Sequence, residues 1–347
     1  MATATSIADQ QLVTKRAQVV FQILVLALLL GLLANYKGAS QVTKIRQVRA
    51  TGTLHLAALP IDNGKTSSAA LINSVAYLRI VWPALVFGVL ISAAARTSLW
   101  GTPLYKIFDG SKVRDQLAAV LAGAPLMLCS CCAAPIFAAV YQRTRKVAPA
   151  LGLTLASPSL NPAALTLSFI LFPWRIATAR LAMALLLVLA GCIVVARIVR
   201  PPAPLPALAH RPTEHTWGRL LTHYAKSVGH ISLGTVPPIL LGIWISMWVM
   251  NRLSFTGMAE GGRLVAIIAV ALFAVLLTLP TFFEIPLALS ILAAGGPAGA
   301  AAALLFAGPA INLSSLLVIG RYSSWKLAFA LAILVWGIAA SGGLLLG

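Results

Sequence analysis

Three cysteines within four positions are the residues of this chain with the most evident chemistry. Cys129, Cys131 and Cys132 lie in an apolar segment. Clustered thiols bind soft centres such as Cu(I), Zn(II), Hg(II) or trivalent arsenic through sulfur, so all three are candidate ligands for a metal or a thiophilic substrate. A redox dithiol is the other use of such a cluster. The fourth cysteine, Cys192, lies alone in a later apolar segment and is interpreted as structural.

A single carboxylate, Glu284, lies within the predicted membrane segments. A carboxylate buried in a membrane is costly and is by default a functional residue, here one that couples transport to protons or cations. The alternative is that Glu284 only caps the N-terminus of a half-helix. Arg180 is expected to reach the interface with its long side chain. Arg79 could pair with Glu284 or attract an anion.

Two proline–asparagine motifs interrupt apolar segments. Asparagine is a good helix cap and proline fits the first helical position, so Asn161 and Pro162 predict a helix restart. A second possible restart is at Ser157 and Pro158. Half-helices that begin inside a membrane aim the positive ends of their dipoles at a central site, which makes Ser157, Asn161 and Asn312 candidate substrate-binding residues. The alternative is a proline kink with asparagine bonded to a neighbouring helix.

The two motifs belong to one repeated pattern. A single offset of 151 positions superimposes three residues of the first half on three of the second, without a gap. The pairs are Pro135 with Pro286, Pro158 with Pro309, and Asn161 with Asn312. Breaks in membrane helices leave backbone groups without water, so they persist where the backbone lines a cavity or is covered by protein. We therefore expect helix breaks near Cys131, Asn161, Phe283 and Asn312, the pattern typical of a transporter.

Composition places the chain in a membrane. Hydrophobic residues make up 60% of the sequence and charged residues only 10%, more apolar side chain than a soluble domain of 347 residues could cover. The net charge of +19 comes mostly from basic residues between apolar spans, where they anchor loops to anionic lipid headgroups, so nucleic acid is not an expected partner. The first apolar span is interpreted as an uncleaved transmembrane helix.

The predicted fold is an all-α polytopic membrane protein with about nine spans of ~20 residues each. Residues 1–68 form an N-terminal helix with a basic loop, 69–200 and 227–347 form two four-span repeats with broken helices, and 201–226 form a Pro-rich linker. The predicted spans are Ala17–Tyr36, Ala69–Ala95, Leu117–Tyr141, Ala148–Phe172, Ile176–Arg200, Val228–Met250, Leu264–Leu289, Gly299–Gly320 and Lys326–Leu346. Loop charges do not decide the orientation, and four crossings per repeat would make the repeats parallel. Oppositely oriented repeats require that one interrupted segment in each half does not cross fully.

With these residues the chain resembles the ArsP-type (YraQ-like) family of predicted bacterial permeases, from about Ala69 to the C-terminus. The resemblance rests on Cys129-Ser130-Cys131 with Pro135, on Ser157-Pro158 with Asn161-Pro162, and on Pro286 with Gly308-Pro309 and Asn312. Members with an assigned role export trivalent organoarsenicals through the cysteines of this motif, which implies that Cys129 and Cys131 are the thiol pair. Cys132 stands where the family commonly has glycine, and it could restrain the local turn more tightly or add a third sulfur ligand.

The sequence therefore predicts a secondary transporter of the bacterial inner membrane that exports a thiophilic solute by alternating access, with Glu284 as the coupling residue. The alternatives are a membrane thiol oxidoreductase that uses Cys129 and Cys131, and a passive channel. No nucleotide-binding loop and no hydrolase motif occurs, so neither an enzyme activity nor a cofactor is expected. The expected partners are membrane lipid and the small solute, and an oligomer is possible.

Overall fold

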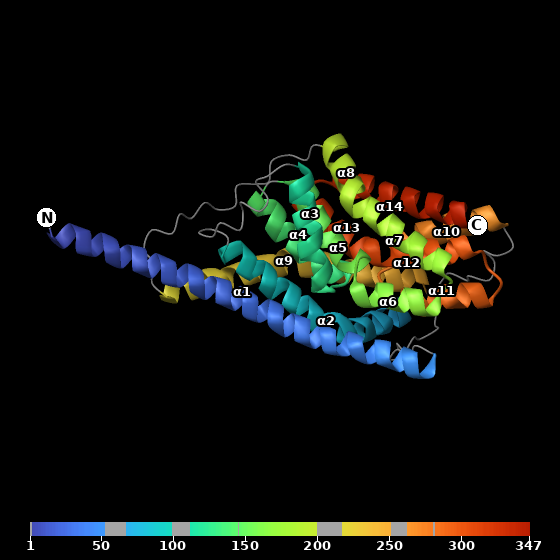
Figure 1. The fold of residues 1–347 in the computed structure, drawn as a ribbon, viewed down its shortest axis with the longest axis horizontal. Coiled ribbons are helices and arrows are strands. Elements are labelled where there is room, and N and C mark those ends of the chain that lie inside the picture. Colours follow the sequence, from blue (N-terminus) through green and yellow to red (C-terminus); the bar gives the residue numbers. More distant parts are fainter. Residues whose placement is uncertain are drawn as a thin grey trace.

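The chain forms a bundle of helices. The computed structural model describes residues 2–52, 67–98, 112–144, 146–199, 217–250, 262–279 and 282–347, and every regular element in these ranges is helical (Figure 1). The first half contains α1 (Ala2–Thr51), α2 (Ser67–Ser98), α3 (Lys112–Gly123), α4 (Ser130–Thr144), α5 (Val147–Ser159), α6 (Pro162–Leu171), α7 (Trp174–Leu185) and α8 (Cys192–Ile198). The second half contains α9 (Trp217–Met250), α10 (Arg263–Leu276), α11 (Glu284–Ala293), α12 (Ala298–Ala310), α13 (Leu313–Tyr322) and α14 (Trp325–Leu346).

Five of the described helical stretches are long and apolar enough to cross a membrane. They are Leu24–Thr51, Ser68–Ala94, Trp174–Ile198, Leu221–Trp248 and Trp325–Leu346. The pair α12 and α13, bent by 42° at its break, would be a sixth span. Four shorter apolar helices accompany them. The prediction of an all-α polytopic membrane protein is thus confirmed.

All four predicted interruptions are present as gaps between helices. The chain leaves helical structure between Leu126 and Ser130, between Ser159 and Pro162, between Leu276 and Glu284, and between Ala310 and Leu313. The predicted spans Leu117–Tyr141 and Leu264–Leu289 are therefore each two helices, in agreement with the breaks expected near Cys131 and Phe283. Ser157 and Pro158 do not restart a helix, because α5 continues through both and ends at Ser159.

Two expectations about the connections are wrong. The basic stretch after Tyr36 was expected to be a loop, but α1 continues through it to Thr51. The predicted linker 201–226 extends too far, because α9 already begins at Trp217. Both stretches contain residues with good helix propensity between the charges, and the helix hydrogen bonds continue through them past the apolar run.

Helix boundaries of the two halves follow the offset of 151 positions. The starts of α3 and α10, of α5 and α12, of α6 and α13, and of α7 and α14 are each separated by 151, as are the ends of α5 and α12 and of α6 and α13. The halves differ around the first break, where α4 and α11 begin at positions that do not match. This local difference lies at the cysteine cluster.

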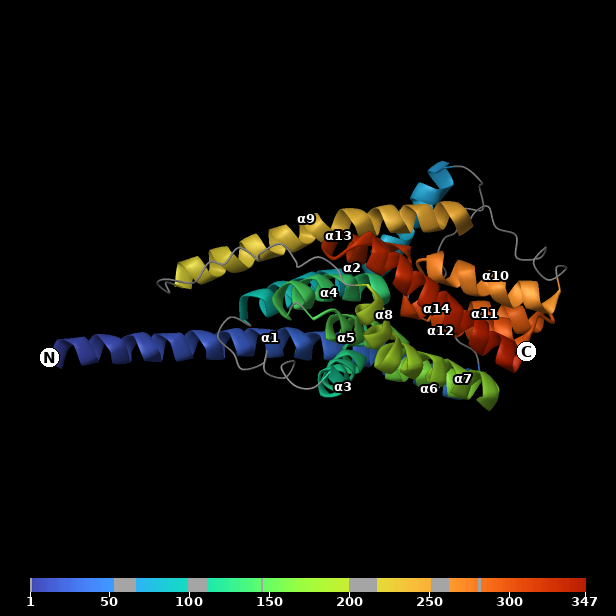
Figure 2. The same cartoon turned by 90° about the horizontal axis from the view of Figure 1, so that it is seen from above.

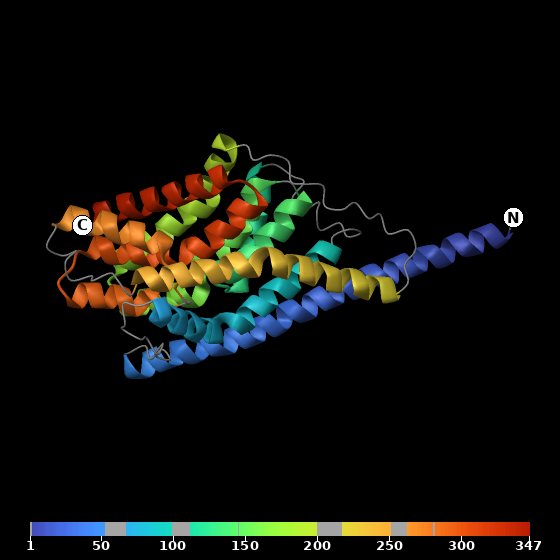
Figure 3. The ribbon, with the colours of Figure 1, turned by 180° about the vertical axis from the view of Figure 1, so that it is seen from behind.

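Equivalent helices run in opposite directions. α2 and α9 pack side by side and antiparallel, as the colours along each helix show in Figures 2 and 3. The α7–α8 segment and α14 are also antiparallel (Figure 1). α10 begins and α11 ends at the same end of the molecule, so the chain turns back between them (Figures 1 and 3). A turn of this kind in one segment of each half is what oppositely oriented repeats would require, and the second half has one.

The centre of the bundle is built from small residues. α5 and α12 contact each other, and both are buried along nearly their whole length. Seven of the 13 residues of α12 are alanine. Lipid tails are as apolar as leucine, so helices in a membrane associate through close packing, which small residues permit. Gly242 shows the same effect in α9: a Cβ there would meet the Oγ, Cα and backbone nitrogen of Ser314 at the start of α13.

Replacement of Gly242 by alanine should therefore destabilise the protein. The added Cβ meets backbone, which cannot rotate away, and overpacking of this kind costs about 1–3 kcal/mol. Gly229→Ala in the same helix is the matched control, because a Cβ at Gly229 meets nothing within 4 Å. We expect a lower thermal unfolding midpoint in detergent for Gly242→Ala and an unchanged or slightly higher one for Gly229→Ala. Equal midpoints would show that α9 does not pack tightly on α13.

Candidate substrate site

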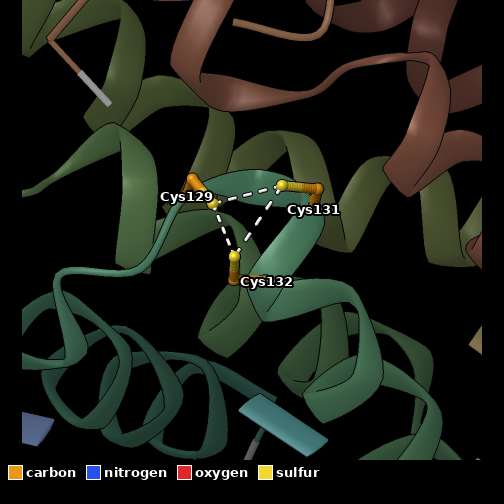
Figure 4. Close-up of side chains that lie close together, drawn as sticks. All are labelled: Cys129, Cys131 and Cys132. Carbon is orange, nitrogen blue, oxygen red and sulfur yellow. Dashed lines mark hydrogen bonds between the residues drawn. The ribbon is translucent and has the colours of Figure 1, made fainter. Parts of the chain in front are cut away.

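The three cysteine side chains face one another at the start of α4 (Figure 4). The Sγ atoms are 2.8 Å apart for Cys129 and Cys132, 3.2 Å for Cys129 and Cys131, and 3.8 Å for Cys131 and Cys132. All three are free thiols, with exposed fractions of 5%, 1% and 0% along the chain. The Tyr77 hydroxyl lies 3.8 Å from the Cys131 sulfur. The sequence motif thus becomes one compact group of sulfur atoms.

The backbone at the break before α4 brings these sulfurs together. Met127 has a φ of 51°, a left-handed conformation that costs a non-glycine residue about 1–3 kcal/mol. It reverses the chain so that Cys129, just outside the helix, faces the two cysteines of the first turn. The amide of Leu128 donates to the Ser157 hydroxyl of α5 at 2.9 Å, so a predicted site residue satisfies a backbone group freed by the break. Ser157 therefore supports the cysteine loop.

Asn312 joins the two halves of the chain at this point. Its amide Nδ2 donates to the Ser130 hydroxyl at 2.7 Å, and Ser130 lies between two of the cysteines. The Asn312 Oδ1 accepts from the amide of Ser315, whose hydroxyl accepts from the Asn312 amide, a capping box at the start of α13. The first turns of α4 and α13 therefore meet at the thiols, with the positive ends of both helix dipoles beside them.

Asn161 caps α6 in the equivalent position of the first half. Its Oδ1 accepts from the amides of Ala163 and Ala164 at 3.0 and 3.3 Å, and Pro162 occupies the first helical position. The Asn161 Nδ2 atom is buried and has no hydrogen-bond partner among the residues that the structure describes. The two asparagines are thus alike as caps and differ in what their amide nitrogens contact.

Glu284 forms an ion pair that also joins the two halves. Its Oε1 lies 3.3 Å from the Nη2 of Arg180 in α7, and both side chains are almost fully buried. Arg180 also donates from Nη1 to the hydroxyl of Ser168 and, at 3.5 Å, to the carbonyl of Ala164, both in α6. Within the described part of the chain, its buried Nε has no hydrogen-bond partner. Glu284 is the first residue of α11, where the helix dipole also favours its negative charge.

The expectation for Arg180 is therefore wrong, and so is one of the two alternatives for Arg79, its pairing with Glu284. Arg180 does not reach the interface, because Glu284 and Ser168 hold its guanidinium inside the bundle. Arg79 is exposed and is not the residue that pairs with Glu284. One feature of the sequence could have predicted this pairing. Arg180 lies inside the apolar span that begins at Trp174, and a charged residue in such a position favours an internal partner.

The prolines lie beside the breaks on both sides. Pro158 and Pro309 are the second-last residues of α5 and α12, each just before a break. Pro135 and Pro286 lie inside α4 and α11, after a break. The structure thus places the predicted site residues at or next to interruptions. The thiols form one group with Ser157 and Asn312, Glu284 forms the ion pair with Arg180, and Asn161 caps α6 as a member of neither group. Tyr77, Ser130, Ser168 and Arg180 are contact residues that the sequence analysis did not identify as such.

Comparison with known proteins supports one family. The family model described as "Predicted permease", ArsP_1, matches residues 68–205. UPF0718 protein YraQ of Escherichia coli (strain K12) is 27% identical over 257 residues, which cover 73% of each chain. No solved structure matches this chain. The resemblance to the ArsP/YraQ-like permease family is thereby confirmed, and with it the prediction of a multi-pass permease of the inner membrane.

The buried ion pair leads to a prediction about stability. Glu284→Gln leaves the Arg180 charge buried without a counter-ion, and breaking a buried pair in this way costs about 3–5 kcal/mol. The double variant Arg180→Met/Glu284→Met removes both charges and should recover most of that loss, because apolar replacements of similar volume are often neutral. The measurement is the thermal unfolding midpoint in detergent, with Arg79→Gln as the exposed control. A single variant as stable as the parent would mean that the pair does not balance the Arg180 charge.

Proposed function

We propose that this permease is a secondary transporter that exports a small thiophilic solute, an organoarsenical or a soft metal species, by alternating access of its two halves. The observation that carries this proposal is the group of three free thiols at the point where α4 and α13 meet. Thiolates bind soft metals and metalloids strongly, whereas hydroxyls and amides do not. The site is buried and lies between the halves, as a transporter needs.

The arrangement of the helices supports alternating access. The two halves have matching helix boundaries and opposite directions, and broken helices from both halves meet at the thiols. Inverted repeats of this kind rock against each other around a fixed site near the middle of the membrane. Two polar contacts beside the candidate site join one half to the other, the Asn312–Ser130 hydrogen bond and the Arg180–Glu284 ion pair, and both would change in such a movement.

Glu284 is proposed to couple transport to protons or cations. In this structure its negative charge is held by Arg180, and this contact ties α11 to α7. A proton or cation that neutralised Glu284 would remove its electrostatic attraction to Arg180 and so release α11 from α7. Rebinding of Arg180 would then expel the proton or cation. The halves could therefore move only with a change in charge at Glu284, which is what coupling requires.

The thiol oxidoreductase alternative receives no support from the contacts of the cysteines. Such enzymes exchange disulfides with a second cysteine pair at an aqueous face, whereas the only other cysteine of the chain, Cys192, is fully buried. A passive channel would conduct without a driving gradient, so the transport measurements below distinguish it.

Removal of the thiol pair should abolish transport. In Cys129→Ser/Cys131→Ser the sulfur ligands are lost while the volume change is small, so the protein should fold. We expect accumulation of phenylarsonous acid in everted membrane vesicles to fall to the level of vesicles without the protein. Cys192→Ser is the matched control and should transport normally. Unchanged flux in a well-expressed double variant would show that these cysteines are structural.

Loss of the charge at Glu284 should uncouple transport from the pH gradient. We expect Glu284→Gln in proteoliposomes to bind the arsenical and to lose net transport driven by an imposed pH gradient. Asp115→Asn is the control, because Asp115 is another buried carboxylate, paired with Lys146 at 2.8 Å, outside the proposed site. The Arg180→Met/Glu284→Met variant separates coupling from stability, since it should be stable and still not respond to the gradient. Full gradient-driven transport in Glu284→Gln would remove this residue from the mechanism.

A further inference from the structure

We propose that Cys132 is a third substrate ligand, and that the site prefers a trivalent metalloid with three exchangeable positions, such as arsenite or antimonite, to an organoarsenical. This inference rests on the proposed function. A site with two thiols can replace both exchangeable groups of an organoarsenical, because the third bond of its arsenic is to carbon. A site with three thiols can satisfy all three bonds of an inorganic centre.

The positions of the three sulfurs fit one small ion. Bonds of about 2.3 Å to sulfur that meet at nearly right angles keep the sulfurs ~3.3 Å apart, whereas a tetrahedral angle spreads them to ~3.8 Å. The observed separations of 2.8, 3.2 and 3.8 Å lie on both sides of the first value, so one small centre can reach all three sulfurs. A trivalent metalloid holds its three ligands on one side and a lone pair on the other, and three convergent thiols can supply all three of those ligands.

The position of Cys132 suits a ligand better than a residue that only packs beside the pair of Cys129 and Cys131. Its sulfur is closer to that of Cys129 than the Cys131 sulfur is. α2 supports this turn directly, because a Cβ at Gly88 would collide with the carbonyl oxygen of Cys132. The backbone of Cys132 is therefore held by a neighbouring helix, and its side chain points into the group formed by the other two thiols (Figure 4).

The charge of the product favours a trivalent centre. Arsenite reacts as As(OH)3 + 3 RSH → As(SR)3 + 3 H2O, with no change of oxidation state and no net charge. Burying an uncompensated charge is costly, and these sulfurs are at most 5% exposed. A monovalent metal would leave two negative charges on the three thiolates. A divalent metal would leave one negative charge.

The organoarsenical reaction leaves one thiol unused. It follows R′As(OH)2 + 2 RSH → R′As(SR)2 + 2 H2O, again without oxidation or reduction. The third thiol would then lie against the organic group R′ in a fully packed site. Inorganic centres should therefore bind more tightly than substituted ones, and Cys132 is the residue that decides the difference.

The test measures binding to the purified, reduced protein in detergent, with arsenite and phenylarsonous acid as the two probes. We expect X-ray absorption of bound arsenite to show three sulfur neighbours in the parent and two sulfurs with one oxygen in Cys132→Ser. Loss of this ligand should weaken arsenite binding by more than about tenfold, since even residues that only orient a ligand cost 10–100-fold. Phenylarsonous acid should bind Cys132→Ser at least as tightly as the parent.

Controls separate this inference from the proposed function. Cys192→Ser should match the parent for both probes, and Cys129→Ser/Cys131→Ser should lose both. Cys132→Ala repeats the test if the serine variant does not fold, with folding judged by size-exclusion profile and melting temperature. Two results would overturn the role of Cys132. One is that arsenite is not bound through three sulfurs in the parent protein, and the other is that Cys132→Ser lowers the affinity for both probes equally. A parent that binds neither arsenical would instead overturn the thiophilic transporter itself.

Discussion

The need to satisfy backbone groups at interrupted membrane helices governs this structure. Each break frees N–H and C=O groups that have no water to bond, and every unsatisfied group costs several kcal/mol in an apolar medium. Side chains close the breaks here. Asn161 and Asn312 cap α6 and α13, and Ser157 accepts from the amide of Leu128. Polar residues that would be rare in a membrane are therefore concentrated where the helices stop.

The chemistry of the site follows from the same constraint. Half-helices that start inside the bundle aim partial positive charge at its centre, which suits thiolates and carboxylates. The two halves use the same position differently. The 151 offset places Phe282 and Phe283 of the second half opposite Cys131 and Cys132 of the first, and Glu284 opposite Ala133. One half thus carries the thiols and the other the carboxylate, so the same position of the pattern holds different chemistry in the two halves.

Structure could be predicted from the sequence wherever a residue determines the conformation or the capping of the backbone next to it. Prolines and asparagines mark helix ends by their local chemistry, so the four breaks and the caps at Asn161 and Asn312 could be predicted. Contacts between distant segments could not. Neither the Ser130–Asn312 hydrogen bond nor the pairing of Arg180 with Glu284 has a local signature, because each depends on how the two halves pack. The length of α1 was missed for a related reason: hydropathy marks the end of an apolar run, whereas a helix can continue beyond it.

Under the proposed alternating-access mechanism, the difference between the two asparagines distinguishes this state of the bundle from the opposite one. In a protein with two equivalent halves, alternating access exchanges the conformations of the halves. Here the Asn312 amide nitrogen contacts Ser130 of the other half, while the Asn161 amide nitrogen is buried and unpaired. Leaving such a donor unsatisfied costs about 1–3 kcal/mol. The same offset pairs Ser130 with Thr281, another hydroxyl residue, which lies outside the described residues. In the opposite state we infer that Asn161 gains a partner from the second half and Asn312 loses its own. The free energy of the exchange would then nearly cancel, which allows a small driving force at Glu284 to decide the direction.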